Sequence, residues 1–141
     1  MGYSVLFGRI LFASIFVLAA LGHLSSQEIA FAASQGVPLA WIAVPFSGLM
    51  ALVGGFSIAL GYKARAGAVL VILFLLPVTF MMHQFWTATD PMIAADQMAH
   101  FLKNVSLIGS ALFIFYFGSG PLSLDARGRS NAVTDPEHAA A

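Results

Sequence analysis

The sequence of 141 residues contains no cysteine and few charged residues, and both absences narrow the class of protein. Without cysteine, thiol relays, disulfide exchange and thiolate ligation of metals are excluded. Asp, Glu, Lys and Arg together make up only 9% of the chain, and the formal net charge is zero. No basic tract alternates with aromatic residues, so we expect no nucleic-acid partner.

Apolar residues dominate the chain instead. They account for 60% of the residues, and the mean hydropathy of +0.90 is far from that of a soluble domain. Four apolar runs of roughly twenty residues can each cross a hydrocarbon core of about 30 Å as a helix. These runs are residues 5–24, 39–60, 66–86 and 98–117. The sequence therefore predicts an all-α fold, an integral membrane four-helix bundle in contact with the lipid bilayer.

The segments outside these runs complete the expected organisation. Residues 25–38 are too short to span a membrane and too apolar to be freely solvated, which predicts a short interfacial segment after the first span. Residues 119–141 contain Gly, Ser, Asp, Arg and a terminal Ala run, a composition typical of weakly ordered extensions. We therefore predict a four-span bundle over residues 1–118 and a weakly ordered cytoplasmic tail over residues 119–141.

The first apolar run resembles a signal peptide with Arg9 as its basic region. The apolar stretch continues on both sides of Arg9, so we interpret the run as the first span. One helical face of this run carries both of its ionisable residues. That face consists of Arg9, Ala13, Phe16, Ala20 and His23. This arrangement turns Arg9 toward the bundle, while a second interpretation has its side chain snorkelling to the nearby interface.

The second and third spans carry packing signals. The second span has a stripe of small residues at i+4 spacing, which lets another helix approach closely, within the chain or between copies of a homo-oligomer. The stripe consists of Ser47, Ala51, Gly55 and Ala59. Pro77 lies inside the third span, and it predicts a bend about one turn before His83.

The distribution of Lys and Arg predicts the orientation of the chain. Basic residues lie near one set of predicted helix ends, and the loops after the first and third spans contain none. The basic residues near these ends are Arg9, Lys63, Arg65, Arg127 and Arg129. Because cytoplasmic loops carry the excess of Lys and Arg, we expect a multi-pass protein of the plasma membrane with both termini in the cytoplasm.

Residues 77–106 place ionisable and aromatic groups inside otherwise apolar runs. In the third span, Thr79, His83 and Trp86 fall at i, i+4 and i+7 on one helical face. In the fourth, five polar residues fall within an arc of roughly 120°: Asp96, Gln97, His100, Lys103 and Asn104. These two polar faces meet across a short loop in the outer half of the bundle. The candidate ligand-binding residues are Thr79, His83, Trp86, His100, Lys103 and Asn104.

Lys103 lies roughly 9 Å below the start of its predicted helix. An ammonium at that depth costs about 2.5 to 3.5 kcal/mol before any partner is found. Asp96 and Glu28 are the available carboxylate partners, and His83 and His100 can add hydrogen bonds. Two interpretations stay open: a polar network that only locks the spans together, or a ligand site that faces the outer leaflet.

The histidines and Trp86 suggest two further kinds of site, a metal or haem site and a stacking surface for a ring. His23, His83 and His100 lie near the same predicted level, so two of them could meet at a metal or haem iron. No His-x-x-x-His or Glu-x-x-His pair occurs, and we therefore expect neither haem nor metal. Trp86 fits an interfacial belt, although a ring beside a lysine and histidines also suits stacking on a quinone head group.

Several stretches resemble the DoxX family of small four-helix membrane proteins. These stretches are GRILFASIFVLAALGHL at 8–24, GGFSIALGYKARAGA at 54–68, HQFW at 83–86, the Asp90-Pro91 pair and QMAHFLKNVSLIG at 97–109. The sharpest motif is Phe-x-Lys-Asn before an apolar run, at Phe101, Lys103 and Asn104. The resemblance implies a bacterial inner-membrane protein, related to the small subunit of a thiosulfate:quinone oxidoreductase and to a membrane partner of secreted redox enzymes.

Residues and resemblance together give two functional hypotheses. In the first, the chain is a membrane subunit of a redox system and binds a quinone or a similar amphipathic ring in the outer half. Lys103, Asn104, His83 and His100 would then donate hydrogen bonds to the ring oxygens. In the second, the chain is a non-catalytic anchor or scaffold for an extracytoplasmic enzyme. The expected partners are an extracytoplasmic redox protein or other membrane subunits.

Overall fold

The computed structural model describes residues 2–134, and within them all regular structure is helical. The elements are α1 (Gly2–Gly22), α2 (Ser26–Ser34), α3 (Ala40–Leu60), α4 (Ala64–Met82), η1 (Phe85–Thr87), α5 (Pro91–Phe117) and α6 (Leu124–Thr134). The helices α1, α3, α4 and α5 are long and apolar enough to cross a membrane. These findings confirm the predicted all-α fold with four spans and a short helical segment after the first.

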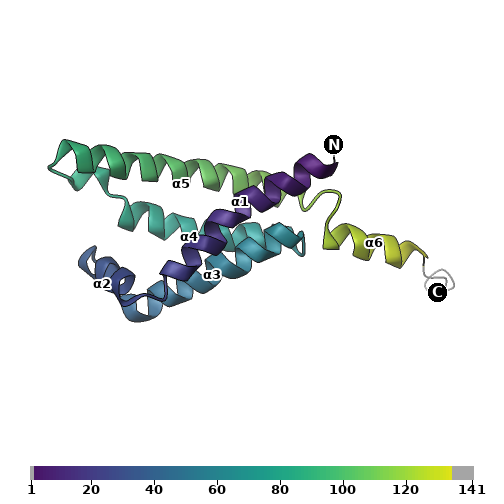
Figure 1. The fold of residues 1–141 in the computed structure, drawn as a ribbon, viewed down its shortest axis with the longest axis horizontal. Helices are drawn as coiled ribbons and strands as arrows, with labels where there is room; N and C mark the ends of the chain where they lie inside the picture. Colours follow the sequence, from purple (N-terminus) through teal and green to yellow (C-terminus); the bar gives the residue numbers. More distant parts are fainter. Residues whose placement is uncertain (1, 135–141) are drawn as a thin grey trace.

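The long helices pack in chain order, α1 on α3, α3 on α4 and α4 on α5, while the short α2 packs on α3. The outer elements α1 and α5 diverge toward the end of the molecule that carries α2 (Figure 1). The N-terminus, the turn between α3 and α4, and α6 lie at the opposite end (Figure 1). We call these the α2 end and the basic end.

The face predicted on the first span is the one that packs against α3. Arg9, Ala13, Phe16 and Ala20 are the buried residues of α1. On α3, a Cβ added at Gly55 would lie 3.1 Å from Val17 and 3.3 Å from the carbonyl oxygen of Ala13. The small-residue stripe therefore packs within the chain, where it lets the two backbones approach closely.

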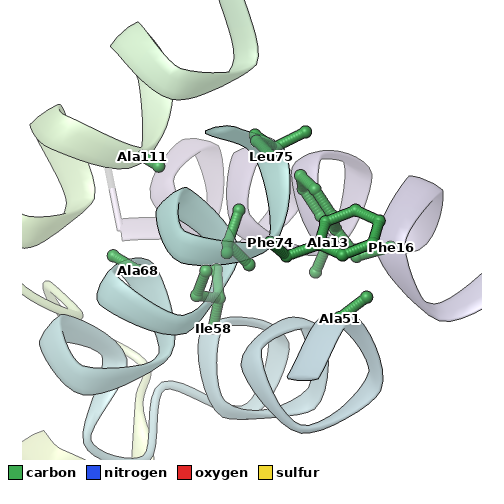
Figure 2. Close-up of a cluster of buried hydrophobic side chains, with 9 residues drawn as sticks. Ala13, Phe16, Ala51, Ile58, Ala68, Phe74, Leu75 and Ala111 are labelled. Atoms are coloured by element: carbon green, nitrogen blue, oxygen red, sulfur yellow. The ribbon is translucent and has the colours of Figure 1, made fainter. Parts of the chain in front are cut away.

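A core of nine buried apolar residues joins the four long helices. It consists of Ala13, Phe16, Ala51, Ile58, Ala68, Val71, Phe74, Leu75 and Ala111. Figure 2 shows eight of these residues labelled where the helices meet, with Phe16 near Phe74. The two rings pack edge to face with centroids 6.3 Å apart. Alanines on the facing helices leave room for these large rings, and the packing fixes the floor of the cavity described below.

The third span runs over Ala64–Thr87, close to the predicted residues 66–86, but its helix is broken before the end. Helix α4 stops at Met82, His83 follows as the C-cap residue, and Trp86 belongs to the separate turn η1. The side-chain amide of Gln84 donates to the carbonyl oxygen of Met81, 3.3 Å away, and so satisfies an acceptor at the helix end. The rings of Phe85 and Trp86 then pack on Phe101 of α5. The prediction that Thr79, His83 and Trp86 share one helical face is therefore wrong.

The last span begins earlier than the apolar run at residue 98. The carboxylate of Asp90 accepts hydrogen bonds from the backbone N–H of Met92 (2.7 Å) and of Ile93 (3.1 Å), and Pro91 occupies the first helical position. An Asp cap followed by proline is a favoured helix start, because each relieves the unpaired N–H groups of the first turn. This cap lengthens α5 to 27 residues, so its first turns extend beyond the apolar run.

Arg9 is buried, with only 3% of its surface exposed. Its Nη2 donates to the carbonyl oxygen of Leu122, 2.8 Å away. The expectation that Arg9 turns inward is confirmed, and the alternative that it snorkels to the interface is wrong. The reason is that the chain after α5 folds back over this helix end and supplies the acceptor.

Part of the predicted tail is ordered. In place of a weakly ordered segment from residue 119, the structure has α6, whose Asp125 caps α4 from across the chain. The carboxylate of Asp125 accepts hydrogen bonds from the backbone N–H of Lys63 (2.9 Å) and of Ala64 (3.4 Å), and its own N–H donates to the carbonyl oxygen of Gly61. Residues 135–141 of the predicted tail lie outside the described residues.

The cap at Asp125 predicts that acid releases α6. Burial alone raises the pKa of Asp125, but hydrogen bonds from the Lys63 backbone, Ser119 and the Ala64 backbone, together with the charge of Arg129, hold this pKa below its usual value. A carboxylate whose pKa is lower in the folded chain stabilises the fold above its unfolded pKa of about 3.9 and loses that effect as the pH falls through the folded value.

A single cysteine introduced at Arg127 and carrying a nitroxide label reports this release, because the chain has no other cysteine. We expect the label to become mobile as the pH falls below about 4. In an Asp125→Asn background, where one oxygen accepts in place of two, we expect the label to be more mobile at neutral pH and its mobility no longer to change in acid, since the amide does not titrate. Asp96→Asn, which removes a carboxylate from α5, is the control. Immobility of the label in acid would contradict the capping role.

Candidate functional site

A cavity of about 440 Å³ lies between α1, α4 and α5, where α1 and α5 diverge. Its volume falls in the range of small-molecule sites. The apolar part of its lining is Ile15, Phe16, Leu18, Ala19, Gly22, Phe74, Leu75, Val78 and Leu107. Its polar part is His23, Glu28, His83, His100, Lys103 and Asn104. Four of the six predicted site residues therefore line one cavity: His83, His100, Lys103 and Asn104.

Lys103 is held by its neighbours on α5. Its Nζ lies 3.2 Å from Nδ1 of His100, whose Nε2 lies 3.8 Å from a carboxylate oxygen of Asp96. Because the ammonium can only donate, Nδ1 of His100 is the acceptor, and the hydrogen of the neutral ring is on Nε2, toward Asp96. The predicted hydrogen-bond network around Lys103 is therefore present, and it leaves two ammonium hydrogens for other acceptors.

His83 is positioned by α5 although it lies at the end of α4. Its Nδ1 is 2.9 Å from Oε1 of Gln97, and its ring stacks on that of His100 with centroids 5.1 Å apart and planes inclined by 12°. An amide oxygen can only accept, so Nδ1 of His83 carries the hydrogen and Nε2 is left as an acceptor. The stack presents two imidazole rings side by side at the cavity wall.

Asn104 is the buried polar residue of the cavity, with 4% of its surface exposed. No hydrogen bond of its side chain is found among residues 2–134. The amide atoms of Asn104 are not among the fully buried polar atoms without a partner, so they are accessible from the cavity and can both donate to and accept from a ligand there. Asn104 lies between the polar wall of His100 and Lys103 and the apolar Leu107, one turn further along α5.

Two residues that were not among the predicted site residues, His23 and Glu28, also line the cavity. Nδ1 of His23 donates to the carbonyl oxygen of Ala19, 2.8 Å away, and its ring packs against Phe74. Glu28 is placed by α2, whose N-cap Ser25 accepts a hydrogen bond from the Glu28 backbone N–H. The inward face of the first span already pointed to His23. Glu28 was expected as a partner of Lys103, but among residues 2–134 the hydrogen bond found for the Lys103 ammonium is the one to His100.

Thr79 and Trp86 do not line this cavity. Thr79 is completely buried, and its hydroxyl donates to the carbonyl oxygen of Leu75 at 2.6 Å, one turn earlier in α4. Trp86 is 53% exposed and packs edge to face on Phe85 and Phe101. Thr79 is turned to its own helix and Trp86 lies beyond the end of α4, so the structure does not bring them together with His83 as a ligand face.

A second cavity of about 350 Å³ lies beneath α2, between α3 and α4. It has four residues in common with the first cavity: His23, Glu28, Val78 and His83. The rest of its lining is mostly apolar, with Phe31, Ala32, Val37, Ala43, Val44, Ser47, Pro77, Met81 and Met82. The site therefore has a polar compartment on α5 and an apolar compartment under α2, with histidines and a carboxylate where they meet.

The described part of the chain contains no group of three or more His, Cys, Asp or Glu side chains placed to hold a metal ion. In the two stacked imidazoles, Nδ1 of His83 bonds to Gln97 and Nδ1 of His100 bonds to Lys103. The donors at this site are therefore arranged for a ligand that forms hydrogen bonds.

Four helices long and apolar enough to cross a membrane, packed around an apolar core, define a multi-pass integral membrane protein. The DoxX family model matches residues 4–84. The inner membrane protein YphA of Escherichia coli K12 is 30% identical over 125 residues, which cover 87% of this chain and 89% of that protein. The chain therefore belongs to the DoxX family and is a multi-pass protein of the inner membrane. No solved structure matches it.

Proposed function

We propose that this chain is a membrane subunit of a redox system and binds a quinone, or a similar amphipathic ring, in the cavity between α1, α4 and α5. The observation that carries the proposal is the amide of Asn104, which lines the cavity between a polar wall and an apolar floor and has no hydrogen-bond partner among residues 2–134. A ligand with ring oxygens and an apolar body satisfies both parts of this lining.

The residues of the cavity suit a ring with oxygens on opposite sides. The ammonium of Lys103 and the amide of Asn104 donate hydrogen bonds, which are stronger in a low-dielectric pocket than in water. Phe16 and Phe74 form an apolar floor for the ring, and the compartment beneath α2 has room for an apolar substituent. A bound quinone supplies the capacity to exchange two electrons and two protons. The imidazoles of His83 and His100 can hold protons beside it.

Solvent extraction of gently purified protein tests this proposal. We expect the extract to contain a quinone, and a short-chain quinone added to extracted protein should raise the melting temperature, since binding stabilises the folded state in proportion to RT ln(1 + [L]/Kd). An absorbance spectrum of the same sample reports haem. A haem spectrum, or no shift with any quinone tested, would decide against the proposal.

An anchor or scaffold function is the second candidate, and exposed apolar residues at the α2 end favour it. Phe31 is 46% exposed, Trp86 53%, Ile93 57% and Met92 82%. Met92 and Ile93, in the first turn of α5, lie outside the apolar run of residues 98–117, where a bilayer need not cover them. This surface suits an extracytoplasmic partner, and substitutions there should reduce partner retention without changing quinone binding.

We also propose that both termini face the cytoplasm. Lys63, Arg65, Arg127 and Arg129 all belong to the basic end, and α2 and the turn between α4 and α5 belong to the other. An alkaline phosphatase reporter, which is active only when exported, should be inactive when fused after Ala141 and active when inserted after Ala88. The reverse pattern would invert the proposed orientation and place the cavity in the cytoplasmic half.

A further inference from the structure

A third cavity, of about 430 Å³, opens at the basic end between α4, the end of α5 and α6. Its lining is Lys63, Ala64, Arg65, Ala66, Phe117, Gly118, Ser119, Gly120, Asp125 and Arg129. Three of these side chains are cationic and one is anionic. Measured from Asn104 to Phe117, the cavity lies about 20 Å along α5 from the candidate quinone site, at the level where apolar helices give way to charged residues.

The single carboxylate in this lining is already engaged. Both oxygens of Asp125 accept backbone N–H groups at the start of α4. Arg65 is held nearby, because its Nη2 donates to the carbonyl oxygen of Tyr116, 3.2 Å away, at the end of α5. The guanidinium of Arg65 has further N–H donors, and Lys63 and Arg129 add two more cations. The cavity therefore presents a positive field with free donors, which suits a phosphate group.

An apolar groove continues from this cavity along α5. It has a volume of about 550 Å³ and is lined by Gly109, Leu112, Phe113, Tyr116 and Phe117. Phe117 lines both the groove and the cationic cavity. The rings of Phe113 and Phe117 stack with centroids 6.3 Å apart, and both side chains are about 70% exposed. The groove therefore leads from the cationic cavity into the membrane-spanning part of α5.

We infer that the basic end is a binding site for an anionic phospholipid. Lys63, Arg65 and Arg129 bind the phosphate head group, and one acyl chain lies in the groove over Gly109 and Phe113. A soluble phosphate compound would use the cationic cavity alone, and a zwitterionic lipid would use the groove but gain less from the charges. The continuity of the two surfaces through Phe117 favours an anionic lipid over both.

Thermal unfolding of the full chain in mild detergent tests this site with three probes. These are phosphatidylglycerol, phosphatidylcholine with the same acyl chains, and glycerol phosphate. We expect phosphatidylglycerol to raise the melting temperature well beyond the other two probes. An equal shift with glycerol phosphate would assign the cavity to a soluble phosphate compound and overturn the lipid assignment. Equal shifts with the two lipids would show that this surface binds lipids without selecting an anionic head group, and would overturn the assignment.

Matched variants locate the site. Arg129→Gln and Arg127→Gln each remove one charge from α6, but only Arg129 lines the cavity. Arg129→Gln should weaken phosphatidylglycerol binding about fivefold, and Arg127→Gln should leave it unchanged. Gly109→Phe fills the groove without touching α6, and Gly8→Phe is its control on α1. An added Cβ at either glycine meets no other described residue within 4 Å. Equal effects on phosphatidylglycerol binding of the two arginine variants, or of the two glycine variants, would refute the site.

Discussion

Replacing Gly54 with leucine is expected to prevent α3 and α4 from packing and to lower the stability of the bundle by at least about 3 kcal/mol. An added Cβ at Gly54 would lie 2.9 Å from Cγ2 of Val71 and 3.0 Å from the carbonyl oxygen of Gly67. A Cβ at Gly67 would in turn lie 3.0 Å from the carbonyl oxygen of Gly54. The two glycines thus mark the closest approach of the helices, and a backbone carbonyl cannot move aside as a flexible side chain can.

Size-exclusion chromatography after a series of heating steps measures this effect as the temperature at which the folded species disappears. Gly8→Leu is the matched control, because an added Cβ at Gly8 meets no other described residue within 4 Å. We expect the Gly8 variant to behave as the unmodified protein does. A Gly54→Leu protein with an unchanged transition would show that α3 and α4 are not packed as closely as the structure has them.

Hydropathy predicted the existence and number of the spans, because in lipid a backbone must satisfy its own hydrogen bonds and long apolar runs form helices. It did not predict the break after Met82 in the third span or the start of the fourth span at Pro91. The end of α4 depends on the amide of Gln84 and on the contacts of Phe85 and Trp86 with Phe101, a residue of the next helix. Such contacts exist only once the chain has folded, and Phe85 and Trp86 extend the apolar run beyond the polar pair His83-Gln84.

The sequence also did not indicate that the segment after α5 is ordered. The composition of residues 119–134 is that of a mobile tail, yet Asp125 caps a helix that begins 61 residues earlier, and the carbonyl oxygen of Leu122 accepts from the buried Arg9. Each contact is a long-range pairing of a polar residue with backbone. Periodicity detects faces of single helices, and it carries no information about such pairings.

The candidate site was predictable where it rests on the face of a single helix. His100, Lys103 and Asn104 fall on one side of α5 by their spacing alone, and all three line the cavity. Thr79 shows the limit of this reasoning, because its hydroxyl bonds to its own helix rather than to the cavity. Glu28 joined the lining only through the position of α2, which packs on α3. Helical spacing says nothing about where a short segment between two spans will lie.

The combined substitution of Asn104→Leu and His83→Leu is expected to weaken quinone binding by roughly 2 to 6 kcal/mol, about 1 to 3 for each residue, while the protein stays folded in detergent. Leucine deletes the unpartnered amide of Asn104 and the imidazole that stacks on His100. If these residues only clamp the helices, the result is different. The melting temperature without quinone should then fall, and the added quinone should shift the unmodified and double-variant proteins equally.

Two further variants separate these outcomes. Ser106→Leu is the control, since it replaces a polar residue about half a turn from Asn104 that lines neither cavity. Lys103→Gln keeps a donor and removes the charge at a residue that stays exposed, so it tests the ligand without loss of folding. We expect it to bind quinone more weakly than the control does. Two results together would decide against the quinone site: unchanged quinone binding by the Lys103→Gln protein, and an unchanged quinone-induced shift in the melting temperature of the double variant. The polar face of α5 would then only lock the helices together, and the anchor function would be the better account.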